Sequence, residues 1–292
     1  MATNLPSFTA VDPGLYRRRK VTNAVGLVLS SVSMALGLIG LLWILWTLAY
    51  NGLSALSWDF FTKSTPAPGS EGGGMANAIL GSLMIVGFAA VVSTPIGILA
   101  GVYLSEFGRS SRFAQATRFV VDIMLSAPSI VIGLFVFAIA VATVGHFSGW
   151  AGSLALSLIA IPVVVRTTEN MLNLVPGSLR EAAFALGAPR WKVSVSVTLR
   201  AVKGGVVTGV LLAIARMIGE TAPLLFTALN NQFFSTDMAQ PMANLPVVIF
   251  NFAMSPYEDW QKLAWGGAFL IALVVLAINI AARVLFRDKV QA

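Results

Sequence analysis

Cysteine is absent from this sequence of 292 residues, and histidine occurs once, at His146. The chain therefore has no disulfide framework, no thiolate metal site and no cysteine nucleophile, and one histidine cannot build a histidine metal cluster. Charge is also scarce, since 11% of the residues are charged, against about 25% in soluble domains. Hydrophobic residues make up 57% of the chain, above the roughly 45–50% of soluble domains. This composition excludes a freely soluble globular protein and predicts a membrane protein.

Familiar enzyme motifs are missing as well. The sequence contains no Gly-x-x-x-x-Gly-Lys-Ser/Thr loop for a nucleotide, no His-Glu-x-x-His, no Gly-x-Ser-x-Gly and no dinucleotide fingerprint. The net charge of +7 does not indicate nucleic-acid binding, because the basic residues lie in short loops between apolar runs. We expect no enzyme activity, no cofactor and no metal.

Long apolar runs indicate membrane spans. A helix needs about 20 residues to cross about 30 Å of hydrocarbon. A short run, Trp150 to Val165, follows the third long run so closely that one helix over 119–165 would be about 70 Å long, enough for two crossings. We therefore predict six spans, the five long ones being 24–50, 76–105, 119–145, 204–229 and 263–286.

Basic residues alternate between the two sides of these spans. Sixteen of the nineteen lysines and arginines lie in one set of connecting segments, and only Lys63 and Lys262 lie in the other. The positive-inside rule then places both termini in the cytoplasm. On the outer side, 62–74 is rich in proline and glycine and predicts a solvated, flexible link, while 230–262 predicts a compact outer cap.

The longest inner segment, 166–203, carries the most information. Ser178 and Glu181 have the spacing of a capping box, which predicts a short helix starting at Ser178. Gly187 would end this helix in the left-handed conformation, with Pro189 just beyond, and a new helix would begin near Arg190. Taken alone, this pattern also fits an ordinary amphipathic loop.

A longer pattern in this loop resembles a known family. Glu181-Ala182-Ala183, then Gly187, then Val197-x-Leu199 is similar to the EAA loop of permease subunits of bacterial ABC importers. The resemblance implies that Glu181, Ala182, Ala183 and Gly187 form a coupling helix that docks on a separate ATPase subunit. The sequence departs from the pattern at Val197, usually isoleucine, and at Arg200, usually proline.

Four further runs resemble one branch of that family, the permeases of high-affinity phosphate importers, over the chain from about residue 17 onward. The resemblance implies an all-α type I importer permease in the inner membrane, which translocates inorganic phosphate inward while a partner hydrolyses ATP. It implies as partners a second, different permease, two copies of the ATPase and a periplasmic phosphate-binding protein. The four runs are 161–171, 219–226, 127–135 and 244–256.

The expected organisation follows from the spans and the resemblance. The core holds spans two to six, and includes the coupling loop 169–203 and the periplasmic segment 230–262. In chain order we expect a cytoplasmic segment 1–23, a first transmembrane helix 24–50, a periplasmic loop 51–75, a permease core 76–286 and a cytoplasmic tail 287–292.

Two charges lie inside the fifth predicted span. Arg216 and Glu220 are four residues apart, so one helix would place them on one face. Arg216 would be near the middle of the bilayer, where an ionisable group costs at least about 2.5 kcal/mol. One interpretation is that the two charges neutralise each other in a structural ion pair. The interpretation that we favour is that Arg216 meets the passing phosphate and Glu220 holds the orientation of Arg216.

Arg166 ends the fourth predicted span, where a snorkelling arginine is an ordinary anchor. The resemblance gives it a further role, because it lies in a motif implicated in the transport pathway together with Arg216. Glu169 is the expected partner of Arg166. Asp122 is expected to pair with Arg118 as part of an interfacial ion pair.

Two other functions compete with phosphate import. A permease of another oxyanion importer, for sulfate or molybdate, would share the coupling loop. An ion-driven secondary transporter would often show two hydrophobic halves with interrupted helices, but the sequence shows no convincing internal repeat. The spacings Gly97-x-x-x-Gly101 and Gly205-x-x-x-Gly209 predict close helix packing and no particular function.

Overall fold

The computed structural model describes residues 13–70, 72–108 and 111–285, and these residues are helical with loops and without strands. The predicted tail 287–292 and residues 1–12 of the predicted segment 1–23 lie outside the described residues. The chain divides into two units, one up to Tyr50 and one from Asn51 onward.

The first unit consists of most of α1 (Pro13–Ala55). Its first turns carry the basic residues 17–20, and the apolar residues that follow are distributed on all sides of the helix. A helix that is apolar all round suits a lipid environment. Trp43 and Trp46 lie toward the other end of the apolar stretch, where tryptophan is enriched at membrane interfaces.

Six spans emerge if each sharply bent helix pair counts as one. Four helices are long and apolar enough to cross a membrane, and two further pairs meet this test together. This agrees with the predicted number. The four are α1, α3 with its extension (Ala76–Phe107), α7 (Gly149–Asn173) and α14 (Glu258–Leu285); the two pairs are 112–126 with 129–144, and 190–201 with 203–218.

The first bend corrects the prediction of one helix over 119–145. α4 (Arg112–Ser126) and α5 (Ser129–Val136) meet at an angle of 106°. Proline disfavours a helical conformation in the residue before it and has no N–H to continue the helix. Accordingly Ala127, which precedes Pro128, is extended with ψ of 135°.

The predicted helix over 204–229 is also too long. α11 spans Lys203–Ile218, and the chain leaves the helix at Gly219 before the short α12 (Ala222–Leu225). Glu220 therefore lies just beyond α11 and not within it. The shorter elements are α2 (Trp58–Thr62), η1 (Tyr103–Phe107), η2 (Phe137–Val141), α6 (Ala142–Val144), α8 (Gly177–Ala185), α9 (Arg190–Lys192), η3 (Val193–Thr198), α10 (Leu199–Ala201) and α13 (Leu245–Ala253).

α7 forms the centre of the second unit and is packed against α3 (Ala76–Val102) through two glycines. A Cβ atom built on Gly97 would lie 2.6 Å from Cβ of Val164, and one on Gly101 would lie 2.6 Å from Cβ of Thr168. The predicted close packing is thus confirmed for this pair. Because both residue numbers rise together, α3 and α7 run parallel.

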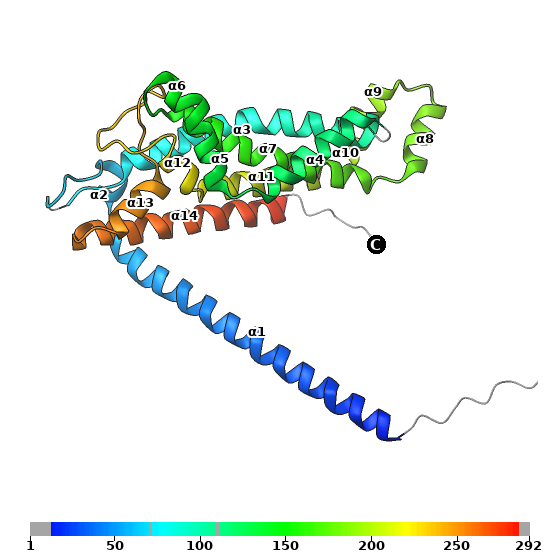
Figure 1. The fold of residues 1–292 in the computed structure, drawn as a ribbon, viewed down its shortest axis with the longest axis horizontal. Coiled ribbons are helices and arrows are strands. Elements are labelled where there is room, and N and C mark those ends of the chain that lie inside the picture. Colours follow the sequence, from blue (N-terminus) through cyan, green and yellow to red (C-terminus); the bar gives the residue numbers. More distant parts are fainter. Residues whose placement is uncertain (1–12, 71, 109–110, 286–292) are drawn as a thin grey trace, which may run out of the picture. The chain divides into compact units, whose positions relative to one another are not determined.

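α11 packs on another side of α7 through the second pair of glycines. A Cβ on Gly205 would meet Met171, and one on Gly209 would meet Thr167. As the number on α11 rises by four, the number on α7 falls by four, so these helices are antiparallel. Figure 1 shows α3, α7 and α11 lying along one another in this unit.

The segment 62–74 is the predicted solvated link only in part, because residues 65–66 and 74 are buried against neighbouring segments while residues 67–70 and 72 are exposed. Thr65 is buried, and the Asn77 amide donates to its hydroxyl at 3.0 Å. Gly74 passes so close to the backbone of α2 that a Cβ would lie 2.2 Å from the carbonyl oxygen of Asp59. Polar composition thus indicated the exposed middle of this segment, but it did not indicate that Thr65 and Gly74 would be buried.

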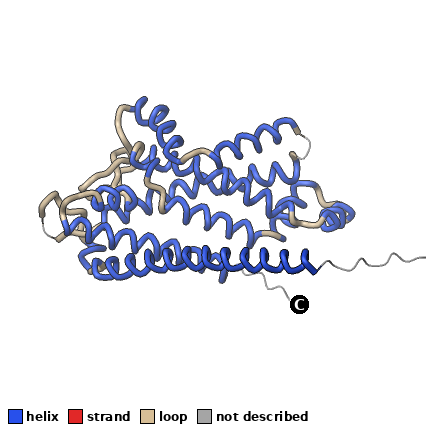
Figure 2. Tube along the Cα trace, turned by 60° about the horizontal axis from the view of Figure 1, so that its bottom comes forward, coloured by secondary structure: helices blue, strands red, loops and turns tan. Residues whose placement is uncertain are grey.

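α8 and the segments around α2, α6 and α13 lie at opposite ends of the second unit (Figure 1). The tube in Figure 2 shows most of the loops gathered at the end away from α8. The predicted inner loop and outer segments are therefore separated by the length of the helical bundle.

Candidate functional site

The coupling loop contains α8, whose start corrects the prediction of a capping box. Pro176 is the N-cap, α8 begins at Gly177, and no side chain caps the helix. Proline fixes the extended entry two residues before Ser178, so Ser178 already lies inside the helix and does not cap it. The predicted end is confirmed, since Gly187 has φ of +77° and α9 begins at Arg190.

One face of α8 is open and partly apolar. Glu181 and Ala182 are exposed, whereas Ala183 is buried against the protein. Leu186, at the tip, is 89% exposed. A short helix that presents small and apolar side chains at the end of the bundle has the shape of a docking element for another protein.

Arg180 fastens the other side of α8 to the bundle. Its Nη1 donates to the carbonyl oxygen of Val175 at 2.6 Å, and its Nη2 donates to that of Leu172 at 2.8 Å. Carbonyl groups at the end of a helix lack partners within it, and a cation there also suits the helix dipole. Nη2 of Arg180 also contacts Oε1 of Glu106 at 2.8 Å, so the charge is neutralised where both side chains are about nine-tenths buried.

Glu106 belongs to η1, a π-helical turn at the end of α3. In an α-helix the Gly108 amide would donate to Leu104, but here it donates to Tyr103 at 2.8 Å. The Leu104 carbonyl oxygen is thereby available, and it accepts from Nη2 of Arg118 at 2.7 Å. The π turn thus connects α3 to α4.

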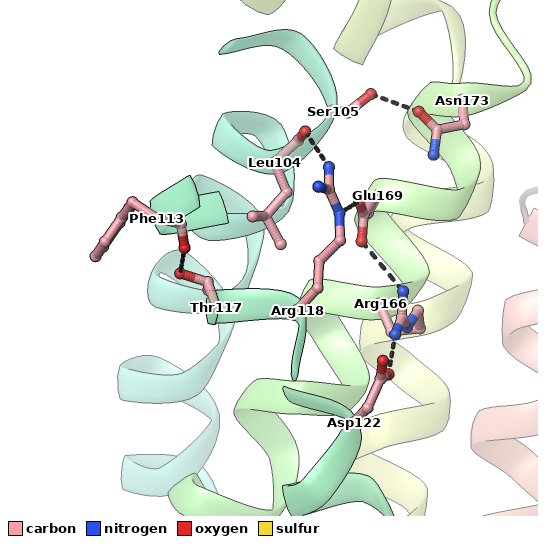
Figure 3. A network of polar contacts seen from close by, with 9 residues as sticks. All are labelled: Leu104, Ser105, Phe113, Thr117, Arg118, Asp122, Arg166, Glu169 and Asn173. Atoms are coloured by element: carbon pink, nitrogen blue, oxygen red, sulfur yellow. Dashed lines mark hydrogen bonds and ion pairs between the residues drawn. The ribbon is translucent and has the colours of Figure 1, made fainter. Parts of the chain in front are cut away.

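Arg118, Glu169, Arg166 and Asp122 form one charged network between α4 and α7 (Figure 3). Nε of Arg118 donates to Oε1 of Glu169 at 2.6 Å, and Nη1 of Arg166 lies 3.4 Å from Oε2 of Glu169. The other end of the Arg166 guanidinium contacts Asp122. The predicted contact of Arg166 with Glu169 is confirmed, whereas the predicted pair of Arg118 with Asp122 is wrong.

The two carboxylates that contact Arg166 differ in their exposure to solvent. The side chain of Glu169 is 6% exposed, and that of Asp122 is 55% exposed. Arg166 itself does not end its helix as predicted, because α7 continues to Asn173, about 10 Å further at 1.5 Å per residue. Arg166 is therefore a residue within the helix, held by a buried partner on one side and an exposed partner on the other.

Arg216, in the last turn of α11, forms an ion pair with Glu220, which lies just beyond the helix. Nε of Arg216 lies 3.4 Å from Oε1 of Glu220, although Glu220 follows the helix and is not on it. The Arg216 side chain is 51% exposed, and that of Glu220 is 15% exposed. Glu220 is thus the more enclosed member of the pair, and the guanidinium of Arg216 is accessible.

The register of α7 and α11 separates the two candidate arginines. With Gly209 beside Thr167 in an antiparallel pair, Arg216 lies level with residue 160. Arg166 is six residues further along α7, a distance of about 9 Å parallel to the helix axis. The structure therefore does not bring them together as one cluster. The two arginines lie at different positions along the axis of α7.

Sequence reasoning missed Arg180 and Glu106, and it paired Arg118 with the wrong carboxylate. The available signal was a charged residue at the end of an apolar run, as Glu106 ends the second span. His146 makes a local contact, its Nδ1 lying 3.1 Å from the carbonyl oxygen of Phe147. Within the described ranges, no cluster of three or more His, Asp or Glu side chains could hold a metal ion.

The sequence model of binding-protein-dependent transport system inner membrane components matches residues 93–288. The chain belongs to this family. Family members are transport components, so this chain is a multi-pass membrane transport subunit and not an enzyme, and an ion-driven secondary transporter is excluded.

Individual relatives extend the match to nearly the whole chain. The chain is 57% identical to the phosphate transport system permease protein PstA of Yersinia pestis, over 94% of this chain and 92% of that protein. It is 38% identical to the phosphate transport system permease protein PstA 1 of Mycobacterium tuberculosis strain H37Rv, over 93% of this chain and 91% of that protein.

Solved structures support the same fold for this family member. A bacterial alginate ABC transporter in complex with its pentasaccharide-bound periplasmic protein matches with a TM-score of 0.61 and 14% identity, over 94% of this chain and 97% of that chain. An inward-facing methionine ABC transporter matches with a TM-score of 0.58 and 20% identity, over 72% of this chain and 92% of that chain. The predicted fold, that of an ABC importer permease, is confirmed.

Proposed function

We propose that this chain is a permease subunit of an ATP-driven importer that moves inorganic phosphate inward. The observation that carries this proposal is the 57% identity to a PstA protein over 94% of the chain. The partners would be a PstC permease as the other half of a heterodimer, two copies of a PstB ATPase and a periplasmic PstS phosphate-binding protein.

The substrate pathway would include Arg216, Glu220 and Arg166. Support comes from the accessible guanidinium of Arg216, which is held by the partly buried Glu220. Arginine suits phosphate because its planar group donates two parallel hydrogen bonds to an oxyanion. The exposed Asp122 on Arg166 is a counter-ion that an entering anion can replace, which suits a weak transient site.

The coupling site would be the exposed face of α8 with Glu181, Ala182, Ala183 and Gly187. Support comes from the position of α8 at one end of the bundle and from the apolar tip at Leu186. Alternating access would then follow from rocking of the two permeases as the ATPase closes. In this proposal α8 and both termini lie in the cytoplasm, as the positive-inside rule predicts.

Reconstitution of the purified chain with PstC, PstB and PstS in vesicles tests the proposal. We expect labelled phosphate to accumulate when ATP is supplied, to stop with vanadate, and to persist when the proton gradient is collapsed. Vesicles assembled without this chain provide the control. Accumulation of sulfate or molybdate in place of phosphate would assign the chain to another oxyanion importer.

A further inference from the structure

The contact between Arg180 and Glu106 joins the coupling helix to the membrane helices at one point. Arg180 uses Nε, Nη1 and Nη2 together, donating to one carboxylate and to two carbonyl groups at the end of α7. A planar guanidinium held by this many bonds in a buried position has little freedom to reorient. A cavity of about 210 Å³ lies beside the pair, lined also by Phe184 and Arg190. The pair is thus a buried polar link between α8 and the end of α3, beside the bonds of Arg180 to the carbonyl groups of Leu172 and Val175 and the packing of α8 on η3.

η1 connects Glu106 to two further helices, α7 and α4. Within this five-residue turn, Glu106 binds α8, Ser105 donates to Oδ1 of Asn173 on α7 at 3.0 Å, and Leu104 accepts from Arg118 on α4. A π turn is less regular than an α turn, and such turns are frequent at functional sites. η1 is thus a junction between the coupling helix, α7 and α4.

The connection continues to one of the candidate arginines. Arg118 holds Glu169 at 2.6 Å, and Glu169 contacts Arg166 at 3.4 Å. Figure 3 shows the last part of this route, from Leu104 through Arg118 and Glu169 to Arg166. Every step from Arg180 to Arg166 is a direct polar contact or lies within η1.

We propose that Arg180 and Glu106 are a positioning pair that transmits movement of the coupling helix α8, through η1, Arg118 and Glu169, to Arg166. When the ATPase displaces α8, the pair moves η1, the acceptor of Arg118 shifts, and the hold of Glu169 on Arg166 changes. Arg166 then exchanges between Asp122 and the transported anion in step with ATP hydrolysis. This inference rests on the proposed function of Arg166.

Glu106→Gln and Arg180→Lys test the pair in the complete transporter. Glutamine keeps the size of Glu106 and one acceptor oxygen but removes the charge and the second acceptor, so it weakens the route through η1 alone. Lysine keeps the charge of Arg180 but cannot span the carboxylate and both carbonyl groups, so it weakens the contacts with η1 and α7 together. Arg200→Lys is the matched control, because Arg200 is exposed on α10 in the same loop.

The decisive readout is the number of phosphate ions imported per ATP hydrolysed by the reconstituted complex. We expect this ratio to fall at least about fivefold in Glu106→Gln, the lower end of typical coupling between sites, and further in Arg180→Lys. Arg200→Lys should match the unaltered protein. An unchanged ratio in both variants would overturn the proposal. So would losses of transport, ATP hydrolysis and assembled complex in equal proportion, because that result describes a contact needed only for folding.

A second readout separates this inference from the function on which it rests. If the unaltered complex imports no phosphate, the proposed function fails, but stimulation of ATP hydrolysis by the binding protein still reports coupling. We expect Glu106→Gln to reduce that stimulation while Arg200→Lys preserves it. Full stimulation in Glu106→Gln would refute the role of the pair whatever the substrate is.

Discussion

Arg118 on α4 donates from Nε to Oε1 of Glu169 on α7 at 2.6 Å, and not to Asp122 one turn away on its own helix. The choice follows from burial, since Glu169 is 6% exposed and an unpaired carboxylate in that position would be costly. Asp122 is exposed and instead contacts Arg166. The charges therefore pair between helices, which ties α4 to α7 and leaves one exchangeable carboxylate at Arg166.

The orientation of the chain can be tested by labelling. Because the sequence lacks cysteine, a single introduced cysteine is the only target of a thiol reagent. We expect Lys63→Cys and Gln240→Cys to react with an impermeant reagent applied outside intact cells, and Ser178→Cys to react only after permeabilisation. All three positions are exposed, so a difference in labelling reports the side of the membrane. Labelling of Ser178→Cys from outside would invert the proposed topology.

Gly187→Val should weaken coupling without preventing membrane insertion. Gly187 has φ of +77°, and a branched side chain in this conformation costs on the order of 1–2 kcal/mol. A Cβ there has open space around it, so the effect would come from the backbone alone. We expect less phosphate imported per ATP in reconstituted vesicles.

Gly177→Val is the control for this change. Gly177 lies in the same loop, has an ordinary φ and also has open space for a Cβ. It should transport like the unaltered chain. Equal behaviour of the two variants would show that the left-handed turn at Gly187 is not required for coupling.

Arg216→Gln should reduce phosphate uptake roughly ten- to a hundredfold, the effect of losing one hydrogen bond to a charged group. Glutamine keeps hydrogen-bonding capacity but removes the positive charge. The protein should still insert, because Arg216 is half exposed and, in the part of the chain that the structure describes, forms its ion pair with Glu220 alone. Uptake of labelled phosphate and membrane content would be measured together.

The double variant Arg216→Gln with Glu220→Gln separates the two interpretations of this pair. If the pair served packing alone, removing both charges should restore uptake, since no unpaired carboxylate remains. If Arg216 contacts phosphate, the double variant should insert normally and stay inactive. Near-normal uptake would end the assignment of Arg216 to the substrate pathway.

Gly101→Ala should destabilise the bundle by about 1–3 kcal/mol, the usual cost of overfilling a packed contact. The added Cβ would lie 2.6 Å from Cβ of Thr168 and 2.9 Å from the carbonyl oxygen of Val165. Since the second contact is backbone, α3 and α7 would have to separate. Gly87→Ala on the same helix meets nothing within 4 Å and should leave the unfolding midpoint in detergent unchanged or raise it slightly. Equal midpoints for the two variants would contradict this account of the packing.

Local properties of the sequence were sufficient to predict the number of helical spans and the left-handed turn at Gly187. The length of an apolar run is set by the thickness of a bilayer, and a left-handed glycine after a short helix depends on residues close to it in the chain. The same local reasoning failed at Pro128 and at Gly219. At both places a helix ends inside an apolar run. Hydropathy does not predict such an end, because it measures how apolar the side chains are and not which backbone hydrogen bonds are lost.

The sequence by itself determined that the chain is an all-helical membrane protein with a coupling loop, because hydropathy and backbone preferences act over a few residues. Only the tertiary structure decided which charges meet between helices, whereas the pairs Arg166–Glu169 and Arg216–Glu220 followed from their spacing in the chain. Arg118 and Glu169 are 51 residues apart, and Arg180 and Glu106 are 74 apart. These partners come together because Gly97 and Gly101 allow α3 and α7 to pack closely in parallel, which brings η1 to the end of α7. A buried charge then pairs with the opposite charges that the packing places beside it, so Glu169 binds Arg118 of another helix as well as its chain neighbour Arg166.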